Sequence, residues 1–220
     1  MTTEMLLVEG AKILTDAWKA RDPLAAGLNN LQEARHESRL LLSWVTSWPL
    51  SSLMAHPERV VAPYQQSLYL DGIRRRAESE PIAYITGLAG FYGREFEVNH
   101  AVLIPRPETE LLVETVLSWC AGETPATGCL PRRAPQPHHD LPLRVLDVGT
   151  GSGCIPISLL CACPKMVATA IDVSQEALDV ARRNAVRHKV DSRLELVRMD
   201  VLGRSEERRV GKKCRYRWWP

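Results

Sequence analysis

The 220-residue sequence lacks any apolar run that approaches the ~20 residues of a membrane-spanning helix. Its amino-terminal segment, MTTEMLLVEGAKILTDAWKA, also lacks the basic region, apolar stretch and cleavage site of a secretory signal. The acids in that segment argue against a transit peptide. We therefore expect a cytoplasmic protein without a membrane partner. Reducing conditions there should keep all the cysteines as thiols, namely Cys120, Cys129, Cys154, Cys161, Cys163 and Cys214.

The sequence also has little net charge, +2, and that charge is unevenly spread. Residues 203–220 carry seven Lys or Arg against two Glu, so the rest of the chain is mildly acidic. An acidic body gives no electrostatic footprint for a nucleic acid, and we expect no direct nucleic-acid partner. A basic RNA-binding arm, with Trp218 and Trp219 as stacking groups, is the alternative for the tail.

No metal site is predicted. The cysteines and histidines that invite a zinc interpretation fit none of the usual short-pair ligand spacings. They are Cys120, Cys129, His138 and His139.

Three patterns precede the most informative segment. Apolar positions recur at helical spacing up to about residue 80, which predicts a helical domain over 1–80 with three or four short helices. Residues 81–107 mix β-branched residues, aromatics and glycines, as expected of a hairpin linker. Helical spacing returns over Glu108–Cys120, and the proline-rich residues 121–142 should form a surface loop.

Residues 144–200 alternate strand and helix patterns, which predicts a βαβαβ unit with a parallel sheet. Arg144–Val148 has the pattern of a short buried strand, and Cys154–Ala162 has that of an apolar helix. Between them lies the glycine loop Gly149–Gly153 (GTGSG). Its alternate glycines permit a sharp turn and a close approach of the backbone to a ligand.

Acids follow the next two predicted strands. The strand Met166–Ile171 ends at Asp172, roughly twenty residues beyond the glycine loop, where a carboxylate can accept both hydroxyl hydrogens of a ribose. The strand Leu194–Arg198 leads to Asp200, which suits an adenine amino group. Val201 is expected to pack near the ring.

A glycine loop alone also fits a nicotinamide or flavin dinucleotide enzyme of the Rossmann class. The dinucleotide fingerprint is G-x-G-x-x-G, whereas this loop is G-x-G-x-G with Asp147 two residues before the first glycine. S-adenosylmethionine carries no phosphate and needs acids for its ammonium group and ribose, so the pattern favours that nucleoside. A glycine turn with a purely structural role is the remaining alternative.

The sequence resembles the release-factor glutamine methyltransferases, also called the HemK or PrmC family, over most of residues 8–202. The resemblance rests on EPIAYITG (80–87), FYG (91–93) and VLIPRPETE (102–110) together with the glycine loop. It implies an α/β fold: an incomplete Rossmann-like, class I S-adenosylmethionine-dependent methyltransferase domain over 108–202. A small helical domain that contacts the release factor would precede it.

By this resemblance, the protein transfers a methyl group from S-adenosylmethionine to the side-chain amide nitrogen of the Gly-Gly-Gln glutamine in peptide-chain release factors. We expect it to be a monomer with release factors as its partners. Arg106, Pro107, Glu108 and Thr109 would shape the substrate region, although a simple helix start at Thr109 is an equal alternative. The cofactor-binding residues expected from the pattern and the resemblance are Asp147, Gly149, Thr150, Gly151, Ser152, Gly153, Asp172, Asp200 and Val201.

The family's Asn-Pro-Pro-Tyr motif, which follows a fourth strand and acts on the amide, does not occur in these 220 residues. The catalytic residues are therefore unknown. We expect that the sequence is truncated after about Leu202, that the tail 203–220 is an artefact, and that the chain itself is inactive. A non-catalytic relative that binds S-adenosylmethionine or a release factor stays an alternative.

Overall fold

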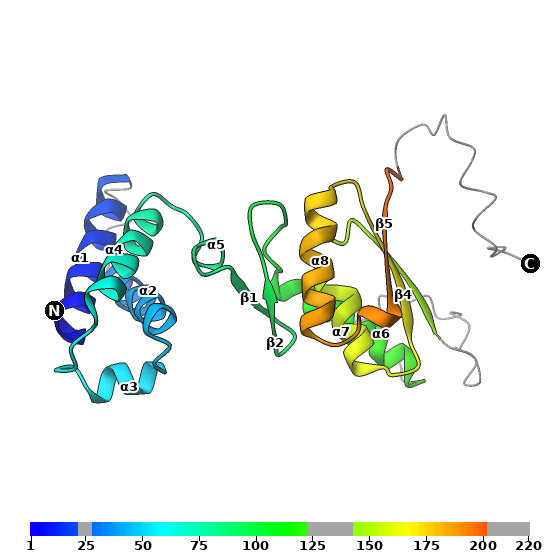
Figure 1. Cartoon of the computed structure of the whole chain (residues 1–220), viewed down its shortest axis with the longest axis horizontal. Coiled ribbons are helices and arrows are strands. Elements are labelled where there is room, and N and C mark those ends of the chain that lie inside the picture. Colours follow the sequence, from blue (N-terminus) through cyan, green and yellow to red (C-terminus); the bar gives the residue numbers. More distant parts are fainter. Residues whose placement is uncertain (22–27, 123–142, 202–220) are drawn as a thin grey trace, which may run out of the picture. The chain divides into compact units, whose positions relative to one another are not determined.

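Residues 1–21, 28–122 and 143–201 are described in the computed structural model, and the chain divides into two compact units between Pro105 and Arg106 (Figure 1). The first unit is helical and ends in a β-hairpin, and the second combines helices with a parallel sheet. The expected fold class, a helical region followed by an α/β core, is confirmed. The predictions for the basic tail and for nearly all of the proline-rich loop lie outside the described residues. None of the described helices could cross a bilayer.

Four helices form the body of the first unit: α1 (Thr3–Arg21), α2 (Leu28–Thr46), α3 (Leu50–Ala55) and α4 (Pro63–Ala77). The expectation of short helices is wrong for α1 and α2, which have 19 residues each. Neither helix contains a proline, and α1 accommodates its one glycine, Gly10, at a close helix crossing. Pro63 begins α4, where its missing N–H costs no hydrogen bond.

A buried polar junction joins α1, α2 and α4 at that crossing. Tyr69 of α4 is fully buried, and its hydroxyl donates to the carbonyl of Leu6 at 2.9 Å. The Ser38 hydroxyl lies 2.6 Å from the Tyr69 oxygen and donates to the carbonyl of Leu7 at 3.2 Å. A Cβ on Gly10 would lie 1.9 Å from the Tyr69 oxygen. Only glycine therefore allows the three helices to approach this closely.

This junction predicts opposite effects for two glycine substitutions. Gly10→Ala should destabilise the chain by about 2 kcal/mol, because the new methyl group displaces the Tyr69 hydroxyl. Gly72→Ala is the matched control, since its Cβ would meet Ile85 at an ordinary 3.5 Å, and it should gain up to about 1 kcal/mol of helix propensity. Urea unfolding followed by circular dichroism measures both. Equal stability of the two variants contradicts this account of the junction.

Residues 81–107 form a hairpin over only part of their length. The short helix α5 (Ile82–Thr86) comes first, which corrects the expectation of a hairpin throughout. Pro81 stands at the N-cap position of α5, and Gly87 ends the helix with a left-handed backbone, φ 74°. Because proline fixes φ and glycine tolerates positive φ, these two residues bound a helix that β-branched residues alone did not suggest.

The hairpin itself consists of β1 (Leu88–Phe91) and β2 (Arg94–Glu97), paired antiparallel. Tyr92 and Gly93, which connect the strands, both have positive φ, 49° and 67°. This is the backbone of a tight two-residue hairpin turn. Phe91 and Phe96 meet edge to face within the hairpin, with ring centroids 6.1 Å apart.

The second unit opens with the short turn η2 (Pro107–Thr109) and the helix α6 (Glu110–Cys120). Its parallel sheet has the strand order β3 (Arg144–Val148), β4 (Val167–Asp172), β5 (Leu194–Arg198). The connecting elements are α7 (Cys154–Ala162), α8 (Gln175–Arg187) and the turn η3 (Asp191–Arg193). The expected bounds of β3, α7 and β5 are confirmed, and β4 begins one residue later than expected.

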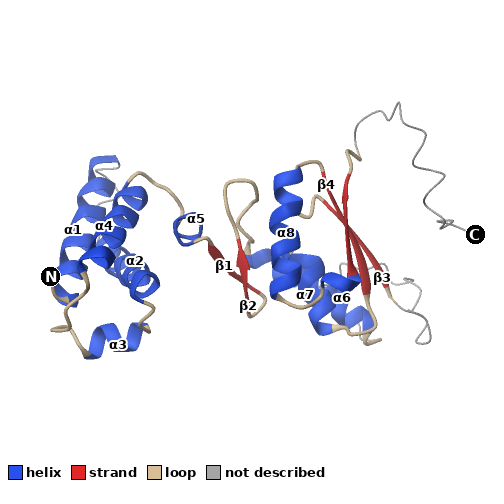
Figure 2. Cartoon of the chain, viewed as in Figure 1, coloured by secondary structure: helices blue, strands red, loops and turns tan. Residues whose placement is uncertain are grey.

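One face of the sheet carries the buried core of the second unit. Ala168, Ala170 and Leu194 point to this face and are buried. Helices α7 and α8 pack on the strands and α6 packs on α7, so that all three lie on one side of the sheet (Figure 2). On the opposite face Leu146 and Val148 are about half exposed among the described residues.

The turn between α7 and β4 is held by a single arginine. The guanidinium of Arg193 donates to the carbonyls of Cys163, Pro164 and Met166 at 3.0 to 3.3 Å, and to that of Leu160 at 2.8 Å. Carbonyls at the end of a helix have no partner within the helix, and a cation there also complements the helix dipole. Arg193 thus fixes the end of α7, the helix that follows the glycine loop.

Candidate functional site

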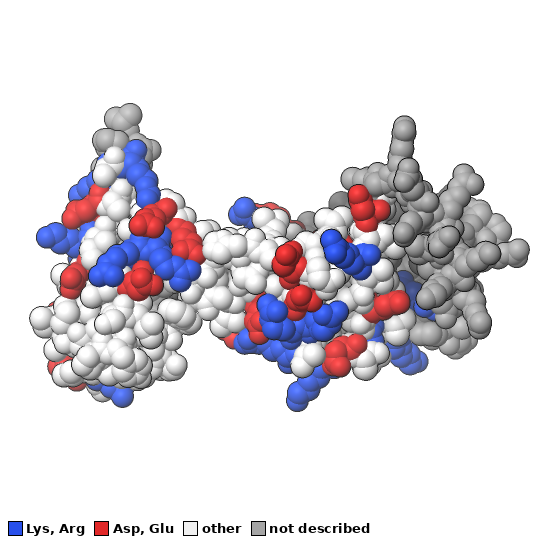
Figure 3. Space-filling model, turned by 45° about the horizontal axis from the view of Figure 1, so that its top comes forward, with Lys and Arg blue, Asp and Glu red and all other residues white. Residues whose placement is uncertain are grey.

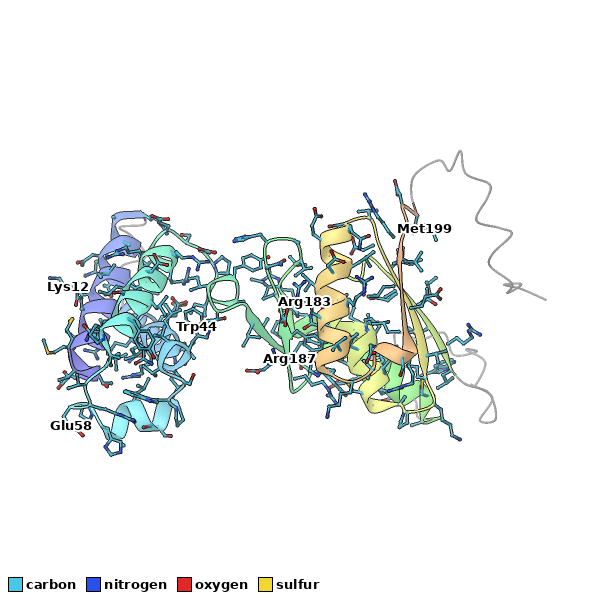
Figure 4. The ribbon with its side chains drawn as sticks, in the orientation of Figure 1. Lys12, Trp44, Glu58, Arg183, Arg187 and Met199 are labelled. Atoms are coloured by element: carbon cyan, nitrogen blue, oxygen red, sulfur yellow. The ribbon has the colours of Figure 1, made fainter. Side chains whose placement is uncertain are left out.

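The carboxyl ends of β3, β4 and β5 meet at one edge of the sheet, as in any parallel arrangement. The glycine loop follows β3, Asp172 closes β4, and Met199 follows β5 (Figure 4). The N–H of Met199 donates to the carbonyl of Asp172 at 3.0 Å. The fold therefore brings together three segments that the sequence separates by about fifty residues.

The glycine loop is anchored on the end of β4. Gly149, Gly151 and Gly153 all have positive φ, at 77°, 54° and 77°. The N–H groups of Gly149 and Thr150 donate to the carbonyl of Ile171 at 2.8 and 3.0 Å, and that of Gly153 donates to the carbonyl of Thr150. Gly153 is also packed closely, because a Cβ there would lie 2.9 Å from Ile157.

Asp172 connects the loop to the start of α8. One carboxylate oxygen accepts the N–H of Gly151 at 2.9 Å, and the other accepts the N–H of Ser174 at 3.0 Å. Ser174 caps α8, as expected, by accepting the N–H of Ala177. Four of the five N–H groups of Gly149–Gly153 therefore have acceptors within the protein.

Two buried oxygens beside the loop have no hydrogen-bond partner among the described residues. They are Oδ2 of Asp147 and Oγ1 of Thr150. Burial raises the pKa of the Asp147 carboxyl, the Thr150 hydroxyl beside it opposes this rise, and the negative charge of Asp172 adds to it. An unpaired buried polar atom costs about 1–3 kcal/mol, so native proteins keep few of them outside ligand sites. The loop and its acids form a cradle with open polar positions.

The remaining expected site residues are more exposed. Asp200 and Val201 follow β5 at the same edge of the sheet, and both are exposed. Arg106, Pro107 and Glu108 are exposed in and beside the η2 turn, in which the N–H of Thr109 donates to the carbonyl of Arg106 at 3.0 Å. In the described ranges no hydrogen bond or ion pair joins this turn to the glycine loop. Thr109 stands directly before α6 without a side-chain cap bond, so α6 does begin here.

Comparison with known families supports the same division of the chain. The family model described as PrmC N-terminal domain matches residues 20–87, and the one described as Methyltransferase small domain matches residues 132–211. A release factor glutamine methyltransferase of Koribacter versatilis is 41% identical over 172 residues, which are 78% of this chain and 55% of that protein. The chain combines a PrmC N-terminal domain with a small methyltransferase domain.

The chain spans about a third to just over half of the length of the PrmC-type relatives that it matches. A bifunctional methyltransferase of Rickettsia typhi is 37% identical over 162 residues, 73% of this chain and 31% of that protein. Among solved structures, the N-terminal domain of human METTL16 in complex with SAH aligns with 74% of this chain and 56% of that one. That alignment has 16% identity and a TM-score of 0.35.

One residue that holds the glycine loop was not predicted from the sequence. Asn184 of α8 is fully buried, and its side-chain amide donates to the carbonyl of Ser152 at 2.9 Å. Its neighbour Ala181 packs on the loop, 3.2 Å from where a Cβ of Gly153 would lie. A signal did exist, because Asn184 is a polar residue on the apolar stripe that Ala177 and Leu178 begin.

Replacing Asn184 with leucine should destabilise the chain by about 2 kcal/mol, because the carbonyl of Ser152 loses a buried donor. Val186→Ala on the exposed side of the same helix is the matched control and should change stability by no more than about 0.5 kcal/mol. Urea unfolding of the two variants tests this. If Asn184→Leu is as stable as Val186→Ala, the amide does not hold the loop.

Proposed function

We propose that this chain binds S-adenosylmethionine in the cradle formed by the glycine loop and the acids that follow the strands. The observation that carries the proposal is the pair of unpaired buried oxygens, on Asp147 and Thr150. The Asp147 oxygen is an acceptor, and the Thr150 hydroxyl can accept as well as donate, which suits a ligand with several N–H or O–H donors, such as an amino acid joined to a ribose. A pyrophosphate would instead need free backbone N–H groups, and the loop uses most of its own internally.

Different residues would bind different parts of the cofactor. Asp147 would accept the ammonium group of the methionine part, and the glycines would let the backbone approach it. Each oxygen of Asp172 accepts one N–H and retains a further lone pair, so this carboxylate can still accept the ribose hydroxyls. Asp200 and Val201 would flank the adenine. Bound S-adenosylmethionine supplies the electrophilic methyl group.

We further propose that the methyl acceptor is the side-chain amide of the glutamine in the Gly-Gly-Gln motif of release factors. The proposal is supported by the similarity to relatives such as the release factor glutamine methyltransferase of Koribacter versatilis, together with the match to a PrmC N-terminal domain. An amide nitrogen is a poor nucleophile, so the protein has to align it with the methyl group. The turn Arg106–Thr109 is proposed to shape the acceptor region. A monomer in the cytoplasm fits this role.

Calorimetric titration of the chain with S-adenosylhomocysteine tests the cofactor proposal. Binding is expected at one site. The affinity of the Asp172→Asn variant should be at least about tenfold lower, because the asparagine amide cannot accept both backbone N–H groups and the ribose hydroxyls. Asp179→Asn, an exposed acid of α8, is the matched control and should bind normally. Binding of a nicotinamide dinucleotide in place of S-adenosylhomocysteine would refute the proposal.

The acceptor is tested with a chimera, because the relatives are longer than this chain. Residues 1–201 are joined to the part of the Koribacter versatilis protein that follows its matched segment. We expect a release factor to gain the mass of one methyl group on its Gly-Gly-Gln glutamine, and Asp172→Asn to lower the rate at least about tenfold. A release factor with alanine at that glutamine is the control. A chimera that binds the cofactor without transferring a methyl group would contradict the proposed acceptor and indicate a non-catalytic role for the chain.

A further inference from the structure

The helical unit carries a groove that the cofactor site does not use. It lies along α1 and α2 and reaches past the end of α3, and its volume is about 510 Å³. Among the described residues its floor is apolar and includes Leu7, Val8, Ala11, Leu31, Leu53 and Met54. Val8 and Met54 are 64% and 66% exposed, which is a large exposure for apolar side chains that line the same groove.

The dimensions of the groove suit a helix. On α1 the lining residues run from Glu4 to Asp16, which is about 18 Å of helix axis, or three turns. An elongated apolar groove between helices is the usual receptor for the apolar stripe of an amphipathic helix. Met54 adds an adaptable side chain of the kind that fits varied apolar partners.

The charges on the walls of the groove indicate which charges a bound helix would carry on its polar face. Arg35 and Arg39 stand four residues apart on α2, so their guanidinium groups lie one helical turn apart on the same wall. Other arginines of this unit are paired: Arg75 contacts Glu80 and Arg76 contacts Glu37. In the described part of the chain, Arg35 and Arg39 make no hydrogen bond or ion pair with a neighbour.

The opposite wall carries Glu4, Lys12 and Asp16 on α1. Lys12 is labelled on this helix in Figure 4. The surface of the unit has a broad uncharged area beside a cluster of mixed charges (Figure 3). The charged residues described on the α2 wall are therefore both basic, whereas the α1 wall carries both signs.

We propose that this groove binds an amphipathic helix of a partner protein, about three turns long. Leucine or methionine side chains of that helix fill the floor. Two acids one turn apart on the helix face Arg35 and Arg39. The proposal stands independently of the cofactor site, which lies in the other unit.

The probe is a fluorescein-labelled peptide of about 15 residues, bridged to hold it helical, with leucines at helical spacing and glutamates one turn apart on one flank. A second peptide carries lysines in place of the glutamates. Fluorescence anisotropy with the full chain measures both. We expect the glutamate peptide to bind at least about tenfold more tightly at low salt.

Charge reversal provides the decisive comparison. The double variant Arg35→Glu, Arg39→Glu should lose about tenfold in affinity for the glutamate peptide and gain affinity for the lysine peptide. Arg74→Glu, an exposed cation outside the groove, is the matched control and should bind as the native chain does. Val8→Glu should weaken both peptides, because it places a charge on the apolar floor.

Three results overturn the proposal. The first is no binding of the glutamate peptide, and the second is equal affinity of the native and charge-reversed chains for it. The third is a dimer, detected by analytical ultracentrifugation, that Val8→Glu dissociates, because a second copy of the chain would then occupy the groove. Circular dichroism shows that each variant keeps the native helix content before it is compared.

Discussion

The site depends on one carboxylate. Asp172 accepts the N–H of Gly151 with one oxygen and the N–H of Ser174 with the other, so it fixes the glycine loop and the first turn of α8 together. The carbonyl of the preceding residue, Ile171, takes two more N–H groups of the loop. Four of the five N–H groups of the loop are satisfied in this way, and the buried Oδ2 of Asp147 is left as an acceptor without a hydrogen-bond partner among the described residues.

The local elements of the second unit could be predicted from the sequence. The bounds of β3, α7 and β5, and the cap at Ser174, follow from short apolar runs and a cap residue that act within a few positions of one another. The helix α5 was missed because its boundaries are set by Pro81 and Gly87 rather than by its β-branched interior. The sequence pattern did not give the length of α1, whose one glycine, Gly10, lies where Tyr69 packs against the helix.

Contacts across the sequence could not be predicted in this way. Asn184 donates to the carbonyl of Ser152, and Arg193 donates to carbonyls around the end of α7. The partners are about thirty residues apart in the sequence. No local pattern encodes such pairs, because each depends on how helices and strands pack. The same holds for the groove of the helical unit, whose lining comes from α1, α2, α3 and Pro57 after α3. The acids Asp147 and Asp172, by contrast, were predictable because strand ends meet by topology alone.

We propose that the cradle of this chain is an acceptor site for the donors of a sulfonium nucleoside. A crystal structure of the chain with S-adenosylhomocysteine tests it most directly. We expect the amino group of the ligand to lie within hydrogen-bond distance of Oδ2 of Asp147, and its ribose hydroxyls to donate to Asp172. A ligand bound elsewhere, or one that leaves both carboxylates without a new partner, would contradict it.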